Sequence, residues 1–516
     1  MARLLRKVAE RRLALLVCAA AASALPGQDI SPVRLRAHVR FLSSDLLEGR
    51  GAGTRGGDLA TEYLASQLAV AGAQPGGENG TWFQPVPLVA VRTGADSWLS
   101  VNGARLEWLT EFAGQARTQA EVEEFSAEAV FVGHGITAPE FGHDDYAGAD
   151  VAGKVVVLFA NEPPSADPAW FGGPALTYYG RWTYKFEEAL RRGAAAAILV
   201  HTPDTAGYGW DVVRSSWGGE EAQVKASGPA LRFAGWVTEA AAARLFAASG
   251  RSVKEWLAAA GARGFRATPL GVKVSGRIGS KLREIRARNV VGRISGGAVA
   301  EETVLFSAHW DHLGMASDGA GDRIYNGAVD NATGCAIVLE VARAWAALQP
   351  KPRRSATFLF TAAEESGLLG ARHWVSHPLA PLARTVLALN FDSFHPFGRT
   401  RDVVVHGAEK TPYWDTVRRV VERNGLQVAP DPRPEQGSFF RSDHFPFFQA
   451  GVPAFSVAAG PTYEVRAEQK AALRRDYAER HYHQPSDEYR DDWDFAGLDQ
   501  IARLGFQIAF EAANRR

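Results

Sequence analysis

The chain has 516 residues, which is too many for one hydrophobic core, so two or more domains are expected. Its 57 basic and 57 acidic residues cancel, which excludes a chain-wide field that would favour nucleic acid or an acidic membrane. With 46% hydrophobic and 22% charged residues, the composition is that of a globular protein. Any function must therefore come from a local site.

The first residues have the pattern of an export signal. Residues 3–12 are basic, an apolar run covers 13–22, and small residues occupy 22–24. The run is shorter than the roughly 18 residues of a membrane span. We therefore predict a signal peptide over 1–24 and an exported protein, periplasmic or extracellular, with no stable membrane insertion after signal removal. A twin-arginine signal at Arg11-Arg12 is an alternative.

The two cysteines limit the chemistry further. Removal of the signal takes Cys18 away and leaves Cys335 as the remaining cysteine. An internal disulfide and a cysteine-based zinc site are then excluded. Lipid attachment at Cys18 is an alternative for the N-terminus.

Two stretches precede the region that carries the chemistry. In 28–105, helical patterns cover Val33–Leu42 and Leu59–Ala71, the second with apolar residues three and four apart. The stretch 106–272 predicts an inserted α/β or β-rich unit, with the strands Val155–Phe159 and Ala196–Val200 on either side of a helix over Phe186–Arg192. It shows no acid–histidine cluster that would make it the reactive part, so we expect the reactive part to lie elsewhere.

From 273 to 516, apolar strands alternate with helices. This pattern predicts an α/β fold with a mostly parallel mixed sheet covered by helices on both faces. A buried helix is expected over Ala336–Leu348. The expected strands are Thr303–Ala308, Thr357–Thr361, Val386–Asn390, Val403–Val405 and Ala454–Val457.

Acids and a histidine follow three of these strands. The strand 303–308 runs into His309, the strand 357–361 into Glu364-Glu365, and the strand 386–390 into Asp392, while Asp330 precedes the buried helix. Each has a structural alternative: a core histidine, acids at a helix N-terminus, or a helix cap. In open α/β sheets, however, ligands bind outside the carboxyl ends of strands, and all of these residues converge on that edge.

The residue types fit a zinc hydrolase. Zinc takes imidazole nitrogen and carboxylate oxygen, and two nearby ions need several ligands and one that bridges. A further carboxylate must remain free of metal to move the proton of the attacking water. The pair Glu364 and Glu365 offers this division. Asp311, two residues after His309, can accept the free imidazole N–H.

The motifs together resemble those of the co-catalytic zinc exopeptidases, metallopeptidase family twenty-eight. That family includes secreted aminopeptidases and glutamate carboxypeptidases. The matching segments are His309-Trp310-Asp311, Asn326–Gly334, Glu364–Gly370, Asn390-Phe391-Asp392, Tyr482-His483, Ser442–Phe447 and Gly451–Ala454. The resemblance covers essentially the whole mature chain. The insert is similar to a protease-associated domain, so the implied organisation is 1–24 signal, 28–105 and 273–516 peptidase domain, and 106–272 insert.

The resemblance implies a site with two Zn²⁺ ions. One would be held by His309 and Asp392, the other by Glu365 and His483, and Asp330 would bridge them. Glu364 would act as base, and a cis peptide would follow Asp330. Tyr482 would steady the oxyanion, with packing as its alternative role.

We therefore predict a secreted di-zinc exopeptidase with a peptide substrate, most consistent with an aminopeptidase. A carboxypeptidase or dipeptidase of the same family is the alternative. Arg399, Arg401 and Arg441 are then candidates to bind a substrate carboxylate, although solvated surface charge explains them as well. A glutaminyl cyclase or a non-catalytic binding protein is less favoured, because the two-metal ligand set is complete.

Overall fold

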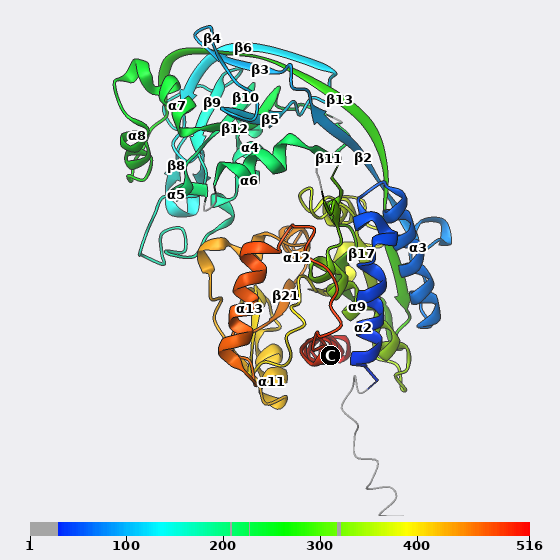
Figure 1. Ribbon diagram of the computed structural model, residues 1–516. Coiled ribbons are helices and arrows are strands. Elements are labelled where there is room, and N and C mark those ends of the chain that lie inside the picture. Colours follow the sequence, from blue (N-terminus) through cyan, green and yellow to red (C-terminus); the bar gives the residue numbers. More distant parts are fainter. Residues whose placement is uncertain (1–28, 207–208, 227, 317–320) are drawn as a thin grey trace, which may run out of the picture.

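The computed structural model describes residues 29–206, 209–226, 228–316 and 321–516, so the predicted signal segment lies outside the described residues. Figure 1 shows a larger and a smaller lobe connected by long curved strands. Within the described ranges, no helix combines the length and apolar character needed to cross a membrane.

The larger lobe is built on a mixed sheet. From β17 to β21 its neighbours β17–β14, β14–β18 and β18–β21 pair in parallel, whereas β2–β13, β13–β17 and β21–β19 are antiparallel. The predicted mostly parallel mixed sheet is thus confirmed where the acids and histidine follow the strands. In spatial order the strands are β11 (Glu220–Val224), β2 (Phe83–Thr93), β13 (Thr268–Ile294), β17 (Arg354–Thr361), β14 (Val299–His309), β18 (Thr385–Asn390), β21 (Ala454–Ala459), β19 (Asp402–His406) and β20 (Gln427–Val428), with β1 (Gln74–Pro75) paired to the end of β13.

Helices cover both faces of this sheet. One face carries α2 (Pro32–Leu42), α3 (Arg55–Val70), α9 (Thr333–Ala346), α11 (Trp414–Arg423) and α14 (Ala496–Asn514), and the other carries α10 (Leu369–Ser376) and α12 (His444–Gln449). In β14, Val304 and Phe306 belong to the first core and Leu305 to the second. Alternate side chains of a strand point to opposite faces, so a strand covered on both sides reads as a continuous apolar run.

The smaller lobe holds a second sheet. Val155 and Val157 of β9 lie in one core, and Val156 lies in another on the opposite face. Its strands are β4 (Ala104–Leu106), β3 (Trp98–Val101), the first part of β13, β6 (Val122–Phe131), β9 (Val155–Phe159), β10 (Ala196–His201), β12 (Phe233–Thr238) and β5 (Phe112–Gln115), and its main helices are α4 (Trp182–Arg191), α6 (Trp210–Gly218), α7 (Glu239–Phe246) and α8 (Val253–Ala260).

The connection between the lobes was not predicted. Strand β13 pairs with β6 and β3 in the smaller lobe and continues to pair with β2 and β17 in the larger one. Between the lobes it carries Lys281, Arg283, Glu284, Arg286 and Arg288, and this charged run hides the strand from a search for apolar patterns. The strand is nonetheless continuous because both lobes supply hydrogen-bonding neighbours.

Candidate metal centre

The predicted site residues come from five separate segments. His309 is the last residue of β14, Glu364 and Glu365 follow β17, and Asp392 follows β18. Since these three strands are parallel neighbours, their carboxyl ends bring the side chains to one edge of the sheet. Asp330 lies in the tight turn Ala328–Ala332 before α9 (Thr333–Ala346), and His483 follows α13 (Ala467–Arg480).

The five predicted ligands meet around Asp330. Its Oδ1 lies 3.2 Å from His309 Nε2, which is also 3.2 Å from Asp392 Oδ1. Its Oδ2 lies 3.3 Å from His483 Nε2, which is 3.1 Å from Glu365 Oε2. Asp330 therefore presents one oxygen to each of two histidine–carboxylate pairs.

These separations fit metal ligands. Two atoms each about 2.1 Å from one tetrahedral zinc stand roughly 3.4 Å apart, close to the distances between these nitrogens and oxygens. The buried Nε2 of His483 forms no hydrogen bond despite its two carboxylate neighbours. Two of the groups able to hold an ion are His309 with Asp330 and Asp392, and His309 with Glu364 and Glu365.

The charge balance also calls for cations. Asp330 is buried, Glu364 is half-buried, and the side chain of Glu365 is 7% exposed. The guanidinium of buried Arg50 does not pair with them, because it donates to the backbone carbonyls of Trp310, Asn326, Gly327 and Leu42. Buried carboxylates without a partner are costly, so bound cations would stabilise this cluster.

The neighbouring acids Glu364 and Glu365 differ in their proton affinity. Burial, together with the charges of Asp392 and Glu365, raises the pKa of Glu364 well above its ordinary value. Burial acts in the same direction on Glu365, but the charges of His483 and His312 prevail and lower its pKa to about 2. One carboxyl is thus suited to hold a proton and the other to remain an anion.

Asp330 is held by its backbone as well as by its neighbours. The carboxylate of Asp487 accepts hydrogen bonds from the N–H groups of Val329 and Asp330, at 3.0 and 3.1 Å. The peptide bond between Asp330 and Asn331 is cis, as the family resemblance implied. The Asn331 side chain then accepts from the N–H of Gly334 at 2.9 Å, which ties the turn to the first residues of α9.

Asp311 and Tyr482 also lie at the site, with contacts that differ from the expected ones. His309 Nδ1 is 3.2 Å from the backbone carbonyl of Asp311 and 4.0 Å from its carboxylate. The carboxylate instead accepts from the N–H of Glu364 at 3.1 Å. Asp311 thus holds both His309 and the acid pair. The ring of Tyr482 stacks on His483 with centroids 3.9 Å apart and is 42% exposed.

Sequence reasoning missed His312 and Ser442 as site residues. His312 Nδ1 lies 2.6 Å from Glu365 Oε1, and its ring is edge-on to His483. Ser442 accepts from the Asn390 amide at 2.6 Å and donates to Asp392. Ser442 stands inside a motif that was noted and His312 directly follows another, but the spacing of these motifs does not show which side chains the two residues contact.

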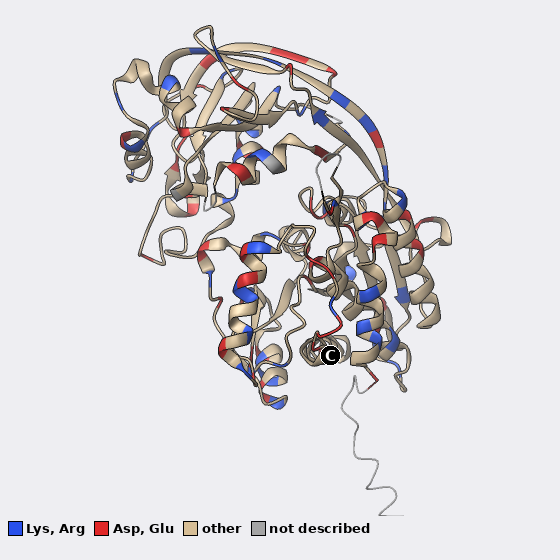
Figure 2. Ribbon diagram, in the orientation of Figure 1, with Lys and Arg blue, Asp and Glu red and all other residues tan. Residues whose placement is uncertain are grey.

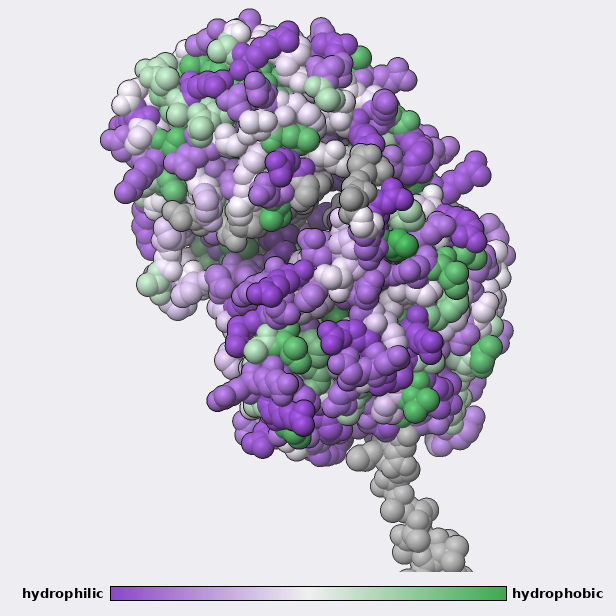
Figure 3. Space-filling model, in the orientation of Figure 1, coloured by the Kyte–Doolittle hydropathy of each residue, from purple (hydrophilic) through white to green (hydrophobic). Residues whose placement is uncertain are grey.

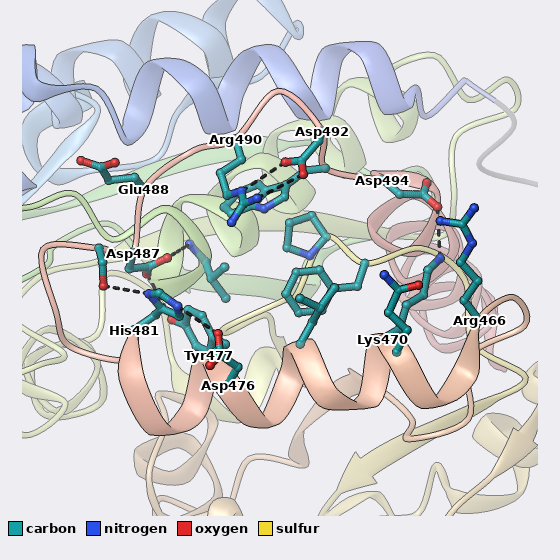
Figure 4. A pocket seen from close by; sticks show the side chains of 17 residues that line it. Arg466, Lys470, Asp476, Tyr477, His481, Asp487, Glu488, Arg490, Asp492 and Asp494 are labelled. Carbon is teal, nitrogen blue, oxygen red and sulfur yellow. Dashed lines mark hydrogen bonds and ion pairs between the residues drawn. The ribbon is translucent and has the colours of Figure 1, made fainter.

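A groove of about 270 Å³ lies beside α13, and its lining includes Asp487, which accepts a hydrogen bond from the N–H of Asp330. Figure 4 shows Asp487 at one end of it, near Tyr477 and His481, and Lys470 and Arg466 at the other. Tyr477 donates to Asp487 at 3.1 Å, so this groove borders the support of Asp330. Its lining includes none of the five predicted ligands.

The metal centre is partly open to solvent. The side chains of His483 and Asp392 are 34% and 20% exposed, whereas that of His309 is 1% exposed. Figure 3 shows a hollow between the two lobes with mostly hydrophilic side chains around it. In Figure 2 the acidic and basic residues are interspersed over both lobes.

The chain resembles known peptidases. The model of Peptidase family M28 matches residues 289–508. The "Leupeptin-inactivating enzyme 1" of Streptomyces exfoliatus is 32% identical over 164 residues, 31% of this chain and 33% of that protein. The "Aminopeptidase NAALADL1" of Rattus norvegicus is 32% identical over 129 residues, 24% of this chain and 16% of that protein. The chain therefore matches a third or less of the length of these curated relatives.

Among solved structures, an aminopeptidase from Aneurinibacillus sp. strain AM-1 has a TM-score of 0.54 and 19% identity, covering 94% of this chain and 95% of that one. This likeness shows that the fold is shared over nearly the whole length. The region that matches the model of Peptidase family M28 contains all five predicted ligands.

Proposed function

We propose that this protein is a zinc-dependent exopeptidase with two metal ions in one site. The observation that carries the proposal is the position of Asp330, whose two oxygens face His309 and His483 separately. A carboxylate so placed can bridge two cations, and it is hard to explain as a helix cap because α9 begins three residues later.

The remaining ligands follow from the same distances. His309 and Asp392 would hold one zinc, and Glu365 and His483 the other. When bound, the pair of ions supplies a water that loses its proton near neutral pH and a positive field for the tetrahedral oxyanion. Ser442 and His312 orient Asp392 and Glu365 by hydrogen bonds, as residues around metal ligands commonly do.

Glu364 would act as the general base. It is the member of the acid pair whose pKa lies above its ordinary value, so it can take a proton from the attacking water and pass it to the leaving amine. Asp311 fixes its backbone through the Glu364 N–H. Tyr482, whose ring stacks on that of His483, would steady the oxyanion.

The number of ions and their necessity can be tested directly. Purified protein should contain about two zinc ions per chain by elemental analysis, and a chelator should abolish peptide hydrolysis until zinc is restored. One ion per chain would favour a cyclase-like site. Full hydrolytic activity in metal-free protein would contradict the proposal.

We further propose that hydrolysis proceeds from the amino end of a peptide. A free amine needs nearby carboxylates, which this site has in excess. Of the arginines that might bind a carboxyl end, Arg399 pairs with Glu464 at 3.5 Å and both are exposed. An aminopeptidase should cut a peptide amidated at its carboxyl end and leave an acetylated one intact. The reverse result would indicate a carboxypeptidase.

Export and the nature of the smaller lobe complete the proposal. Protein recovered outside the cytoplasm should begin near Leu25, which N-terminal sequencing can check. A retained Met1 in cytoplasmic protein would contradict export. We also propose that the smaller lobe, predicted as the insert 106–272, is a protease-associated domain, supported by the two-sided sheet core around β9 and β10. Its sheet also includes β3, β4 and the first part of β13, whereas β11 pairs with β2 in the larger lobe.

A further inference from the structure

One loop of the smaller lobe contacts the larger lobe beside the metal centre. The loop connects β9 to α4, and Figure 1 shows this side of the smaller lobe facing the end of the larger lobe that carries α12. The N–H of Leu176 donates to the carbonyl of Pro434 at 3.0 Å. The ring of Tyr178 lies 4.8 Å from that of Phe445 and 6.1 Å from that of Phe440, measured between centroids.

Tyr178 thereby joins an apolar cluster whose other members belong to the larger lobe. Leu368, Phe439 and Phe445 are its buried part, and Tyr178 and Phe440 pack against it while remaining half-buried. This cluster therefore keeps aromatic surface accessible at the boundary between the lobes.

The cluster is attached to the metal centre on two sides. The N–H of Leu368 donates to the carbonyl of Glu364 at 2.9 Å, so the cluster continues the turn that carries the proposed base. Phe445 is three residues beyond Ser442, whose hydroxyl donates to Asp392. The cluster is therefore continuous in the chain with the proposed base and with a residue that contacts a proposed metal ligand.

The phenol ring of Tyr178 is held in place by a bridge between the lobes. Its hydroxyl donates to Glu187 Oε2 at 2.8 Å, and Glu187 Oε1 lies 3.4 Å from Arg372 Nη1. Arg372 Nε in turn donates to the carbonyl of Gly367 at 3.1 Å. The bridge thus ends on the same turn as Glu364, so the ring has a fixed orientation relative to the acid pair.

We propose that Tyr178 is a specificity-determining residue that favours peptides with a bulky apolar side chain, such as leucine or phenylalanine, at the cleaved terminus. The inference rests on the proposed function. The smaller lobe supplies one wall of the side-chain site in the form of the Tyr178 ring, and the larger lobe supplies the Phe440 ring, with the buried Phe445 packed behind both. Burial of an apolar side chain against these rings stabilises the larger substrates selectively.

The experiment compares leucyl- and alanyl-p-nitroanilide with the zinc-loaded full-length protein. Tyr178→Ala should lower the ratio of the two kcat/KM values by about tenfold, the usual scale for apolar contacts in a specificity pocket. Tyr178→Phe keeps the ring and should keep the ratio. Tyr179→Ala is the matched control, because the ring of Tyr179 packs within the smaller lobe, against Phe141, Phe171 and Tyr184.

A ratio measured on one sample does not depend on the fraction of folded protein, so partial misfolding of a variant does not hide the result. An equal fall for both substrates in Tyr178→Ala, or the same change of ratio in Tyr179→Ala, would overturn the inference while leaving peptidase activity established. If the native protein hydrolysed neither substrate but cut other peptides, the inference alone would fail. No hydrolysis of any peptide would reject the proposed function and this inference with it.

Discussion

Both lobes bury a cluster of histidines and acids, but the negative charge of the buried acids is compensated differently in the two clusters. In the smaller lobe, Asp145 accepts from the N–H groups of His134 and Ile136 at 3.1 and 3.0 Å and lies 2.8 Å from His143 Nε2. The amine of the fully buried Lys185 belongs to the same cluster, where the charges of Asp145 and Glu162 favour its protonated form. This cluster contains its own basic group.

In the larger lobe the buried Arg50 does not serve this purpose, because its guanidinium donates to backbone carbonyls and not to the acids of the metal centre. Among the described residues, all groups able to hold a metal ion lie there, and each includes either His309 or His312. Histidines near acids are therefore not sufficient evidence for a metal site. The distinguishing features are a deficit of positive charge and ligand atoms that converge on a common point.

The largest effect should come from the proposed base. Glu364→Gln keeps the shape of the side chain but removes its proton affinity, so kcat should fall at least ~100-fold while the zinc content stays that of the native protein. Glu365→Gln should instead reduce the zinc content. Elemental analysis beside peptide hydrolysis separates the two. Loss of zinc in Glu364→Gln, with zinc retained in Glu365→Gln, would reverse the assignment.

His312 tests whether the orientation of a ligand matters at this site. Its Nδ1 lies 2.6 Å from Glu365 Oε1, so His312→Gln should weaken one metal by roughly 10- to 100-fold, as loss of a partner of a metal ligand commonly does. Zinc titration with a competing chelator measures the affinity. His481→Gln is a control, since His481 contacts Ser486 and Asp476 rather than the predicted ligands. Equal affinities in the native protein and His312→Gln would show that Glu365 needs no such partner.

Much of this site could be predicted because it follows apolar strands in sequence. Strand β14 was expected over 303–308 and ends at His309 in the structure, so the residue after the apolar run was already at the sheet edge. His312 was missed because side-chain contacts between the loops after β14 and β17 are not encoded by spacing alone. The contact of Tyr178 with Phe445 could not be predicted from the sequence for the same reason, since the two positions are 267 residues apart in the chain.

The smaller lobe's cluster offers a stability test with a defined pH dependence. Burial lowers the pKa of Lys185 from 10.5 to about 7. Between these two values the unfolded chain holds a proton that the native chain has released, so native stability rises with pH by up to about 1.4 kcal/mol per unit. The variant Lys185→Met has no titratable amine at this position. The free energy of unfolding of the native protein, minus that of the variant, should therefore increase from about pH 7 to about pH 10.

Urea unfolding at several pH values gives this difference. The variant Lys154→Met is the control, because Lys154 is on the surface of the same lobe, beside Glu128. A difference for Lys185→Met that stays constant over this range, or falls with pH, would show that Lys185 remains protonated in the native cluster. The lobe would then hold a full internal ion pair instead of a neutral amine.

The smallest effect concerns the bridge between the lobes. Glu187 and Arg372 are each about one-third exposed, so their ion pair should contribute only about 0.2–1 kcal/mol. Glu187→Gln should accordingly lower kcat/KM about two- to fivefold, with unchanged zinc content, because Arg372 becomes freer to leave Gly367. Glu140→Gln is the matched control, because Glu140 accepts a hydrogen bond from Tyr179 within the smaller lobe, as Glu187 accepts one from Tyr178.

A double variant tests whether Glu187 acts through Arg372. If it does, Glu187→Gln/Arg372→Gln should lose no more activity than Arg372→Gln alone. Additive losses, or the same loss in Glu140→Gln, would mean that the smaller lobe does not support the acid-bearing turn through this bridge.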